Sequence, residues 1–548
     1  MERPHVRSAL AGAERDRIVY DLTGIEAQYD ALRAELPGVT VRFAMKACPV
    51  DEVLACLAER GAGFDAASPG EIEQALRTGA APGNVHYGNT VKSDSEIAAA
   101  HRLGITTFAT DCVEDVRAVA RHAPGARVFC RLATTGDGAV WGLTGKCGSD
   151  DPVGVLDEAR RHGLVPAGLS VHVGSQQMTV RAWRRALDDL AAVLPRLEAR
   201  GIRLDHVNLG GGLPAAGYLD RDGGPLTPPT AEIFAAIRAG LRRLRDSARG
   251  DLAVVVEPGR HLVADHGTIR AHVTRLTRRG RVWLYLSCGR FNGLYEGDQL
   301  RYRMEFPTRT GGGSVAAIVA GPTCDSDDTL GGGAPVPVPE DLASGDPVWI
   351  HSAGAYATSY TTRGFNGYGP LPCVTVRAER VRPIGPGDWN TIAALEAGAY
   401  TAAGLSEGPD VLESRARSSP ATSFVLDAGD RVAGYLLALP YPPFRFPDPS
   451  RAEDTVFSSS NLHLHDIVVG DGFRGRGWAK RMLRHLTDTA RSFRYERISL
   501  VAVGGTAGFW SARGYRAHRE IALPAGYGPD AVYMSRTIAD ESRDSCPE

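Results

Sequence analysis

The amino-acid sequence predicts an α/β protein whose first half is a closed (β/α)₈ barrel of the TIM type. Three observations support this prediction. Eight short apolar segments of strand length occur within roughly 230 residues, stretches with helical character separate most of them, and polar or glycine residues follow their ends. Strands that alternate with helices form parallel sheets, and about eight such units close into a barrel.

The eight predicted strands also indicate where an active site would lie. They are residues 41–46, 63–68, 84–89, 106–111, 127–132, 168–173, 206–211 and 252–257, with helices expected between them, for example at 71–79 and 180–201. In such barrels the functional residues lie at the strand ends. Here those ends carry Lys46, Ser68, Asn89, Asp111, Arg131, His172, the glycines 210–212 and Glu257.

Three further regions are predicted after the barrel, which we place at 1–260 with its N-terminal segment. Residues 261–380 read as an antiparallel β domain, with strands expected at 267–276, 281–287, 314–321, 346–354 and 373–381, and with an exposed Gly/Pro-rich loop at 329–346. A separate α/β domain is expected at 381–540. The polar tail 541–548 is expected to fray.

Composition narrows the class of protein. The length of 548 residues suggests two or three domains, and a hydrophobic fraction of 43% is enough for their buried cores. The net charge of −2 favours neither nucleic acid nor membrane as a partner. The N-terminus lacks the apolar core of a signal peptide, and no apolar run reaches membrane-spanning length. Nine cysteines without a CxxC pair indicate a reduced, cytoplasmic protein, and no metal site is predicted.

Four strand-end features of the barrel carry chemistry. A partly buried lysine such as Lys46 has a lowered pKa, and its neutral amine can form a Schiff base. The glycines 210–212 let backbone N–H groups approach an anion closely. Glu257 can keep a pyridine nitrogen protonated, and His172 can stack its flat ring on a cofactor. Each feature also has an ordinary structural explanation when it is taken alone. Lys46 could be a solvated surface lysine and the glycines a simple turn. Glu257 could be a salt-bridge partner and His172 a packed core histidine.

Nine segments, in order, resemble the barrel-type, pyridoxal-phosphate-dependent decarboxylases of basic amino acids, especially the bacterial ornithine/lysine decarboxylases. They are RFAMKACP, FDAASPGEIE, HYGNTVKSDSEI, HVGSQ, NLGGGLP, EPGR, GPTCDSDD, GDPVWIHSAGAYATSY and FNGYGPL, and they cover about residues 15–380. The resemblance implies pyridoxal 5′-phosphate (PLP) as cofactor and conversion of a basic amino acid into a diamine.

The resemblance also assigns roles to individual residues. Lys46 would carry the cofactor covalently, His172 would stack on it, and Glu257 would pair with the pyridine nitrogen. Cys324 and Asp325 lie in a stretch that reaches into the second subunit's site in these enzymes, which implies a homodimer with shared sites. Cys324 would return a proton to the substrate α-carbon. The other expected cofactor-binding residues are Asp65, Ser175, Gly211, Gly212, Gly259, Arg260 and Tyr356.

Substrate choice is expected to depend on Asp325, which would hold the distal amine of lysine or ornithine. Relatives often carry an aspartate just before the glycine of the YLSCGRFNG segment, where this chain has Ser287 and Cys288. That departure leaves the chain length of the substrate open. A diaminopimelate- or arginine-type decarboxylase, with an acyltransferase acting on an unrelated amine, and a non-catalytic PLP-binding regulator are the alternatives.

The segment 460–486 reads as a strand, a glycine-rich loop and a helix. Gly475 and Gly477 would present backbone N–H groups at the start of the helix, where a pyrophosphate binds. Arg474, Gly477 and Ala479 fit the R-x-x-G-x-A pattern, and with AGFWSARGYRAH (507–518) the region resembles the GCN5-related N-acetyltransferases. The residues expected to bind acetyl-CoA, or another acyl-CoA, are Ile467, Val469, Arg474, Gly475, Arg476, Gly477 and Ala479.

The expected acyltransferase chemistry needs a base and an acid. His463, His465 and Asp466 are candidates for the base that deprotonates the acceptor amine. Many relatives use a tyrosine as the acid, but this chain has Trp510 there, so Tyr515, Tyr533 or a water molecule is expected to replace it. We therefore expect a bifunctional enzyme that decarboxylates lysine or ornithine and acylates an amine, most simply the resulting diamine, in polyamine or siderophore biosynthesis.

Overall fold

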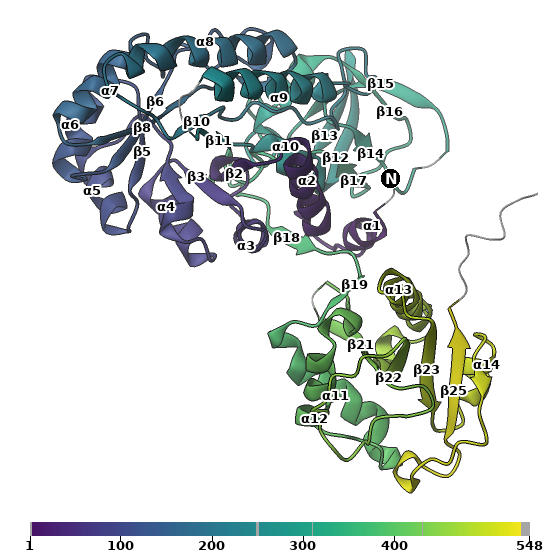
Figure 1. The fold of residues 1–548 in the computed structure, drawn as a ribbon. Helices are drawn as coiled ribbons and strands as arrows, with labels where there is room; N and C mark the ends of the chain where they lie inside the picture. The colour runs from purple at the N-terminus through teal and green to yellow at the C-terminus, as the bar shows by residue number, and fades with distance from the viewer. Residues whose placement is uncertain (1–2, 248–250, 310, 430, 539–548) are drawn as a thin grey trace, which may run out of the picture. The chain divides into compact units, whose positions relative to one another are not determined.

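The computed structural model describes residues 3–247, 251–309, 311–429 and 431–538. The chain divides into two compact units, one ending at Val376 and the other beginning at Arg377 (Figure 1). The predicted polar tail 541–548 lies outside the described residues. Within the ranges given, no helix combines the length and the apolar character that crossing a bilayer requires.

The predicted closed barrel is confirmed, and all its neighbouring strands pair in parallel. Around the barrel the strands are β10 (His206–Asn208), β11 (Ala253–Val256), β2 (Val39–Ala44), β3 (Gly63–Ala66), β4 (Val85–Tyr87), β5 (Thr107–Thr110), β6 (Arg127–Arg131) and β8 (Val165–Ser170). Helices surround them (Figure 1): α2 (Leu22–Glu35), α3 (Asp51–Glu59), α4 (Pro69–Arg77), α5 (Asp94–Arg102), α6 (Val113–His122), α7 (Pro152–Arg161), α8 (Val180–Glu198) and α9 (Thr230–Ser247).

Local sequence explains these helices. Helix α8 buries Trp183, Leu187, Leu190 and Leu194, and this spacing of three and four residues places them on one face toward the barrel. Ser68, predicted at a strand end, caps α4 instead, because its Oγ accepts a hydrogen bond from the backbone N–H of Glu71 at 3.3 Å. Capping of this kind ends the strand and starts the helix within a few residues.

The second domain of the first unit is a mostly antiparallel, mixed sheet. Its strands follow the order β14 (Met304–Glu305), β17 (Pro347–Ile350), β12 (Gly267–Arg279), β13 (Arg281–Leu286), β15 (Ser314–Ala320) and β16 (Val336–Pro339). The N-terminal strand β1 (Arg17–Asp21), which follows α1 (Pro4–Ala11), pairs with β12 and, in parallel, with β18 (Cys373–Val376). The pair β13–β15 is also parallel.

One prediction in this domain is wrong. The segment 329–346 was expected to be an exposed loop, yet it contains β16, which pairs with β15. Its prolines made the pattern look like a loop. Strand β16 ends the sheet order, however, and an edge strand tolerates prolines because their missing N–H groups can fall on the unpaired side.

The second unit is a seven-stranded sheet with helices on both faces. Its order is β19 (Arg380–Pro383), β20 (Phe424–Asp427), β21 (Val432–Pro440), β22 (Asn461–Val469), β23 (Arg497–Ala502), β25 (Val532–Thr537) and β24 (Arg516–Ala517). One apolar core joins the sheet to α13 (Trp478–Ser492) and α14 (Ala507–Ser511). The other joins it to α11 (Trp389–Tyr400) and α12 (Pro409–Ser418).

Candidate active sites

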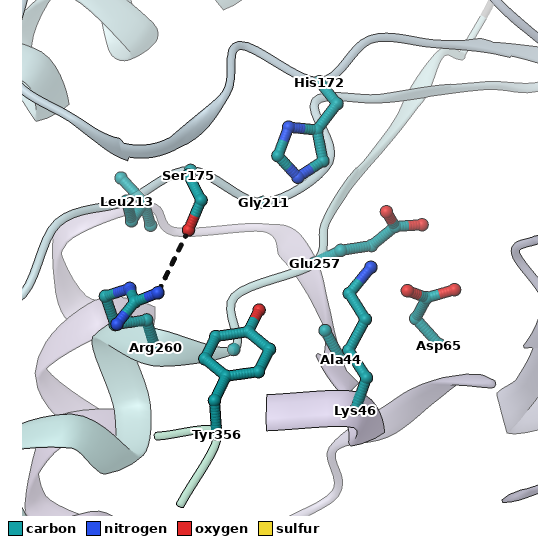
Figure 2. A pocket seen from close by; sticks show the side chains of 12 residues that line it. Ala44, Lys46, Asp65, His172, Ser175, Gly211, Leu213, Glu257, Arg260 and Tyr356 are labelled. Carbon is teal, nitrogen blue, oxygen red and sulfur yellow. Dashed lines mark hydrogen bonds between the residues drawn. The ribbon is translucent and has the colours of Figure 1, made fainter. Parts of the chain in front are cut away.

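The barrel brings ten of the predicted site residues to one cavity (Figure 2). Most come from the ends of β2, β3, β8, β10 and β11. Ser175 begins the short strand β9 (Ser175–Gln177), and Tyr356 lies in the segment after β17. They are Lys46, Asp65, His172, Ser175, Gly211, Gly212, Glu257, Gly259, Arg260 and Tyr356, joined by Ala44 and Leu213. The carboxyl ends of barrel strands share one face, which explains why residues so distant in sequence meet.

Lys46 does not extend β2 but stands in a short 3₁₀ turn, Met45–Ala47, just after it. Figure 2 shows its amine pointing toward the carboxylates of Asp65 and Glu257. The expected lowering of its pKa is wrong. Burial lowers the pKa of Lys46, but the electrostatic influence of Asp65, Tyr356 and Glu257 outweighs burial and raises it above its ordinary value.

A histidine that the sequence reasoning missed connects the two carboxylates. His86 Nε2 lies 3.1 Å from Asp65 Oδ1 and 2.9 Å from Glu257 Oε1. Asn208, also missed, donates a hydrogen bond from Nδ2 to Glu257 Oε1, and its Oδ1 accepts from the N–H of Gly210 at 2.9 Å. The available signal was polar side chains within apolar strands, because such groups need partners when buried.

The opposite end of the cavity is cationic. Arg260 is buried, and its two terminal nitrogens contact Glu296 at 2.6 and 2.7 Å. The same group lies 3.4 Å from Ser175 Oγ and 4.9 Å from the ring of Tyr356 (Figure 2). Tyr356 holds a positive φ of 62°, a strained conformation fixed in part by its N–H bond to Ala47 O at 2.7 Å.

These residues fit a PLP molecule. Among the described residues, the buried Nε of Arg260 has no hydrogen-bond partner, so it can bind an anion. A Cβ at Gly211 would lie 2.9 Å from Glu257 O, and one at Gly212 would lie 2.5 Å from Gly174 O. Only glycine backbone therefore fits beside the cavity, which suits close approach of a phosphate.

His172 fits the role of a neutral ring. Burial, with the charges of Arg131 and Lys46, lowers its pKa to about 3. Its Nδ1 accepts a hydrogen bond from the N–H of Gly174 at 3.1 Å, which leaves the proton on Nε2. An uncharged imidazole can lie against an aromatic cofactor without the cost of a buried charge.

Several other highlighted residues lie outside the cavity. Asn89 and Asp111 each hold a loop by a hydrogen bond. Asn89 Nδ2 donates to Ala67 O at 3.3 Å, and Asp111 Oδ2 accepts from the N–H of Gly148 at 2.9 Å. Cys288 is fully buried, and burial raises the pKa of its thiol. Ser287 Oγ accepts from the N–H of His272 at 2.9 Å. Neither residue of this pair lines the cavity.

Cys324 and Asp325 are exposed and do not line their own chain's cavity. Asn366 Oδ1 accepts two hydrogen bonds from Cys324, one from its backbone N–H at 3.0 Å and one from its thiol Sγ at 3.2 Å. The buried Asp328 shapes the same loop, because it accepts from the N–H groups of Arg290 and Thr323 at 2.7 and 3.0 Å. The loop is thus a defined structure that presents both side chains outward.

The second unit contains a cleft of about 690 Å³ at an opening in its sheet. Strands β22 and β23 are parallel neighbours, but their pairing stops at Leu464 and Leu500, although β22 continues to Val469. Pairing with β21 is also irregular between Leu437 and Ala438, and this leaves His465 as an extra residue in β22. The cleft lies where the two strands part.

The predicted acyl-CoA residues divide between this cleft and its rim. Ile467, Val469, Arg474 and Ala479 line the cleft. The loop residues Gly475 and Gly477 have φ values of 77° and 81°, and Gly477 directly precedes α13. Arg476 lies in the same loop, with its guanidinium 5.5 Å from the ring of Phe473.

Of the three candidate bases, His465 and Asp466 line the cleft and His463 does not. His463 is buried against Ser499 Oγ at 3.0 Å. His465 Nε2 lies 2.9 Å from Glu407 Oε1, a partner that sequence reasoning missed because it comes from the segment before α12. Arg415 binds the other oxygen of Glu407 at 2.8 and 2.9 Å.

The remaining acid–base candidates are also separated by the fold. Burial raises the pKa of Asp466 despite the hydrogen bonds that Tyr400 and Tyr435 donate to it. Trp510 lines the cleft, but Tyr515 and Tyr533 do not, so the expectation that one of them serves as the acid has no geometric support. Tyr527, in the C-terminal part of the second unit, does line the cleft, and its hydroxyl donates a hydrogen bond to Pro447 O.

Comparisons with known proteins follow the same division of the chain. Residues 22–264 match the family model of the pyridoxal-dependent decarboxylase pyridoxal binding domain, and residues 389–515 match the acetyltransferase (GNAT) family. A lysine/ornithine decarboxylase of Selenomonas ruminantium is 30% identical over 65% of this chain and 88% of the relative. A diaminopimelate decarboxylase of Pseudomonas aeruginosa is 30% identical over 63% and 85%.

A comparison with solved structures also finds similarity to decarboxylases over the first part of the chain. The lysine/ornithine decarboxylase from Vibrio vulnificus, complexed with cadaverine, aligns with a TM-score of 0.60 at 26% identity. The alignment covers 68% of this chain and 97% of that structure.

Proposed function

Because this chain belongs to the pyridoxal-dependent decarboxylases and carries a GNAT acetyltransferase domain, we propose that it performs two successive reactions. The first unit decarboxylates lysine or ornithine to a diamine. The second unit transfers an acyl group from acyl-CoA to an amine, most simply that diamine. A mono-acylated diamine of this kind would suit a specialised pathway such as siderophore biosynthesis.

One observation carries the decarboxylase proposal: ten residues from separate strand ends line a single cavity with a cationic and an anionic end. Arg260, Ser175, Gly211, Gly212 and Tyr356 would hold the phosphate of PLP. At the other end, Glu257 would face the pyridine nitrogen. Gly259 and Asp65 would complete the wall of the cavity. At Gly259 a Cβ would lie 2.8 Å from Ala47 Cβ, so a larger residue would not fit there.

The chemistry then divides between the cofactor and the side chains. When bound, PLP supplies an electron sink for the electrons of the bond to the leaving carboxylate. Lys46 would hold it covalently, and the neutral His172 ring would cover one face and exclude water. Glu257 would keep the pyridine nitrogen protonated, because its carboxylate is held by Asn208 and His86.

We propose that a partner subunit completes the site. Cys324 and Asp325 are exposed on a loop held by Asp328 and Asn366, away from their own cavity. In a homodimer this loop would enter the neighbouring cavity. Cys324 would return a proton to the α-carbon after CO₂ leaves, and Asp325 would pair with the distal ammonium of the substrate.

In the second unit we propose that His465 is the base. It lies at the point where β22 and β23 part, it lines the cleft, and Glu407 can orient its ring. The backbone N–H groups at Gly475–Gly477 and the start of α13 would bind the pyrophosphate. The amine nitrogen would then attack the thioester carbon, His465 would take the amine proton, and the CoA sulfur would leave as the thiolate.

Mass spectrometry of the products tests both reactions. The full chain with PLP is incubated with lysine, ornithine, arginine or diaminopimelate, with and without acetyl-CoA. We expect cadaverine or putrescine alone, and the mono-acetylated diamine when acetyl-CoA is added. Agmatine, or lysine made from diaminopimelate, would favour the alternative decarboxylase assignments, and a diamine that is never acetylated would separate the two activities.

A further inference from the structure

His86 occupies the middle of the barrel and contacts both carboxylates of the cavity. It lies on β4 directly opposite Asp65 of β3, and its side chain is 2% exposed. Its ring packs against Phe129 of β6, with ring centroids 5.1 Å apart. This packing aims Nε2 at Asp65 Oδ1, 3.1 Å away, and at Glu257 Oε1, 2.9 Å away.

Both contacts require a proton on Nε2, because carboxylate oxygens can only accept. Burial lowers the pKa of His86, but the hydrogen bonds and charges of Asp65 and Glu257 outweigh burial and raise it above its ordinary value. The other cations nearby are Lys46 and Arg42. Among the described residues, Nε and one terminal nitrogen of Arg42 have no hydrogen-bond partner, so Arg42 adds charge without fixing either carboxylate.

The two donors to Glu257 act on the same oxygen. Both His86 Nε2 and Asn208 Nδ2 contact Oε1. Oε2 is thus the oxygen that remains for a further donor at the edge of the cavity. In the proposed function that donor is the protonated ring nitrogen of PLP.

We propose that His86 is a positioning residue that keeps Asp65 and Glu257 ionised together and turns Glu257 Oε2 toward the ring nitrogen of the cofactor. The proposal rests on the assignment of Glu257 in the proposed function. Two buried carboxylates that approach one another favour protonation of one of them, and the positive charges of Lys46 and His86 oppose this. Without His86, a carboxyl group would take up its proton at a higher pH than in the wild type, and a protonated Glu257 could not stabilise a pyridinium.

The test compares His86→Gln and His86→Leu with the matched control His206→Gln. Gln keeps an N–H donor and removes the charge, whereas Leu removes both. His206 contacts the other side of Phe129, 5.7 Å away, and pairs with Asp205 instead of a cavity carboxylate. For each protein the absorbance of bound PLP is titrated against pH, PLP affinity is measured by equilibrium dialysis, and thermal unfolding verifies the fold.

We expect the acid limb of the absorbance titration, and that of kcat, to move upward in both His86 variants by about 1–3 pH units, because the carboxylates then lose protons at higher pH. PLP affinity should fall about tenfold or more in His86→Leu, and by much less in His86→Gln, which keeps the donor. His206→Gln should match the wild type in each measurement.

Two results would overturn the proposal. One is an acid limb in His86→Gln that coincides with the wild type, and the other is an equal displacement in His206→Gln. His86→Gln decides the question by itself if His86→Leu does not fold. Failure of the wild type to bind PLP is a different outcome, since it would reject the proposed function before the variants are compared.

Discussion

The barrel cavity and the C-terminal cleft are built in different ways. In the cavity, charged groups meet charged partners within hydrogen-bond distance: Arg260 binds Glu296, and His86 binds Asp65 and Glu257. The cleft is an opening of about 690 Å³ between parting strands, with apolar residues such as Leu464, Ile467 and Leu500 along its wall. One site is a packed polar network and the other is an accessible groove.

This difference agrees with two kinds of occupant. A network of buried charges is stable only when each member is paired, so it suits a resident cofactor that stays in one orientation. A groove of several hundred cubic ångströms suits a molecule that enters and leaves in every turnover. The four predictions below separate the two sites, beginning with the largest expected effect.

Replacing Lys46 should remove one activity entirely. In Lys46→Ala we expect no measurable decarboxylation and no absorbance from covalently held PLP, because among the described residues Lys46 is the lysine that lines the cavity (Figure 2). Acyl transfer should continue at the wild-type rate. The exposed Lys146→Ala serves as control and should leave both activities unchanged. Loss of acyl transfer in a folded Lys46→Ala protein would contradict the assignment of two separate sites.

Replacing the base of the cleft should have the next largest effect. For His465→Gln we expect a fall in the kcat of acyl transfer of about 10²–10⁴-fold, the usual contribution of a general base. Decarboxylation should not change. His463→Gln is the matched control, because His463 lies on the same strand but outside the cleft. A greater loss of acyl-transfer activity in His463→Gln than in His465→Gln would show that His465 is not the base.

Mixing Lys46→Ala with Cys324→Ala subunits tests whether the decarboxylase site is shared. Cys324→Ala alone should slow decarboxylation while PLP remains bound. After subunit exchange with Lys46→Ala, half of the dimers are mixed and each has one intact site, so activity should recover to about a quarter of the wild-type value. Native mass spectrometry verifies the exchange. No recovery in verified mixed dimers would place Cys324 in its own chain's site.

The glycine loop should give the smallest change. Gly477 has a φ of 81°, so Gly477→Val strains the backbone by about 1–2 kcal/mol and should weaken acyl-CoA binding about 5- to 30-fold. Gly472→Val is the control, because Gly472 has no left-handed φ and a Cβ there has open space around it. Isothermal titration with acetyl-CoA measures both. Equal affinities in the two variants would exclude the loop from the binding site.

The sequence by itself determined the order of elements and the face of the barrel that carries the site. Alternating strands and helices specify a parallel sheet, and eight units close it into a barrel. Closure brings all strand ends to one face, so residues as far apart in sequence as Lys46 and Glu257 could be predicted to meet. In the same way, the glycine loop at 475–477 indicated a helix start without knowledge of its neighbours.

Only the tertiary structure decided which side chains pair. His86 and Asn208 lie within strands, and their contacts with Glu257 depend on the register of β4 and β10 around the closed barrel. Glu407 reaches His465 from a distant segment. The pKa of Lys46 rises because Asp65, Tyr356 and Glu257 surround it in space. Electrostatic energies depend on distance and burial, and a linear pattern of residues specifies neither.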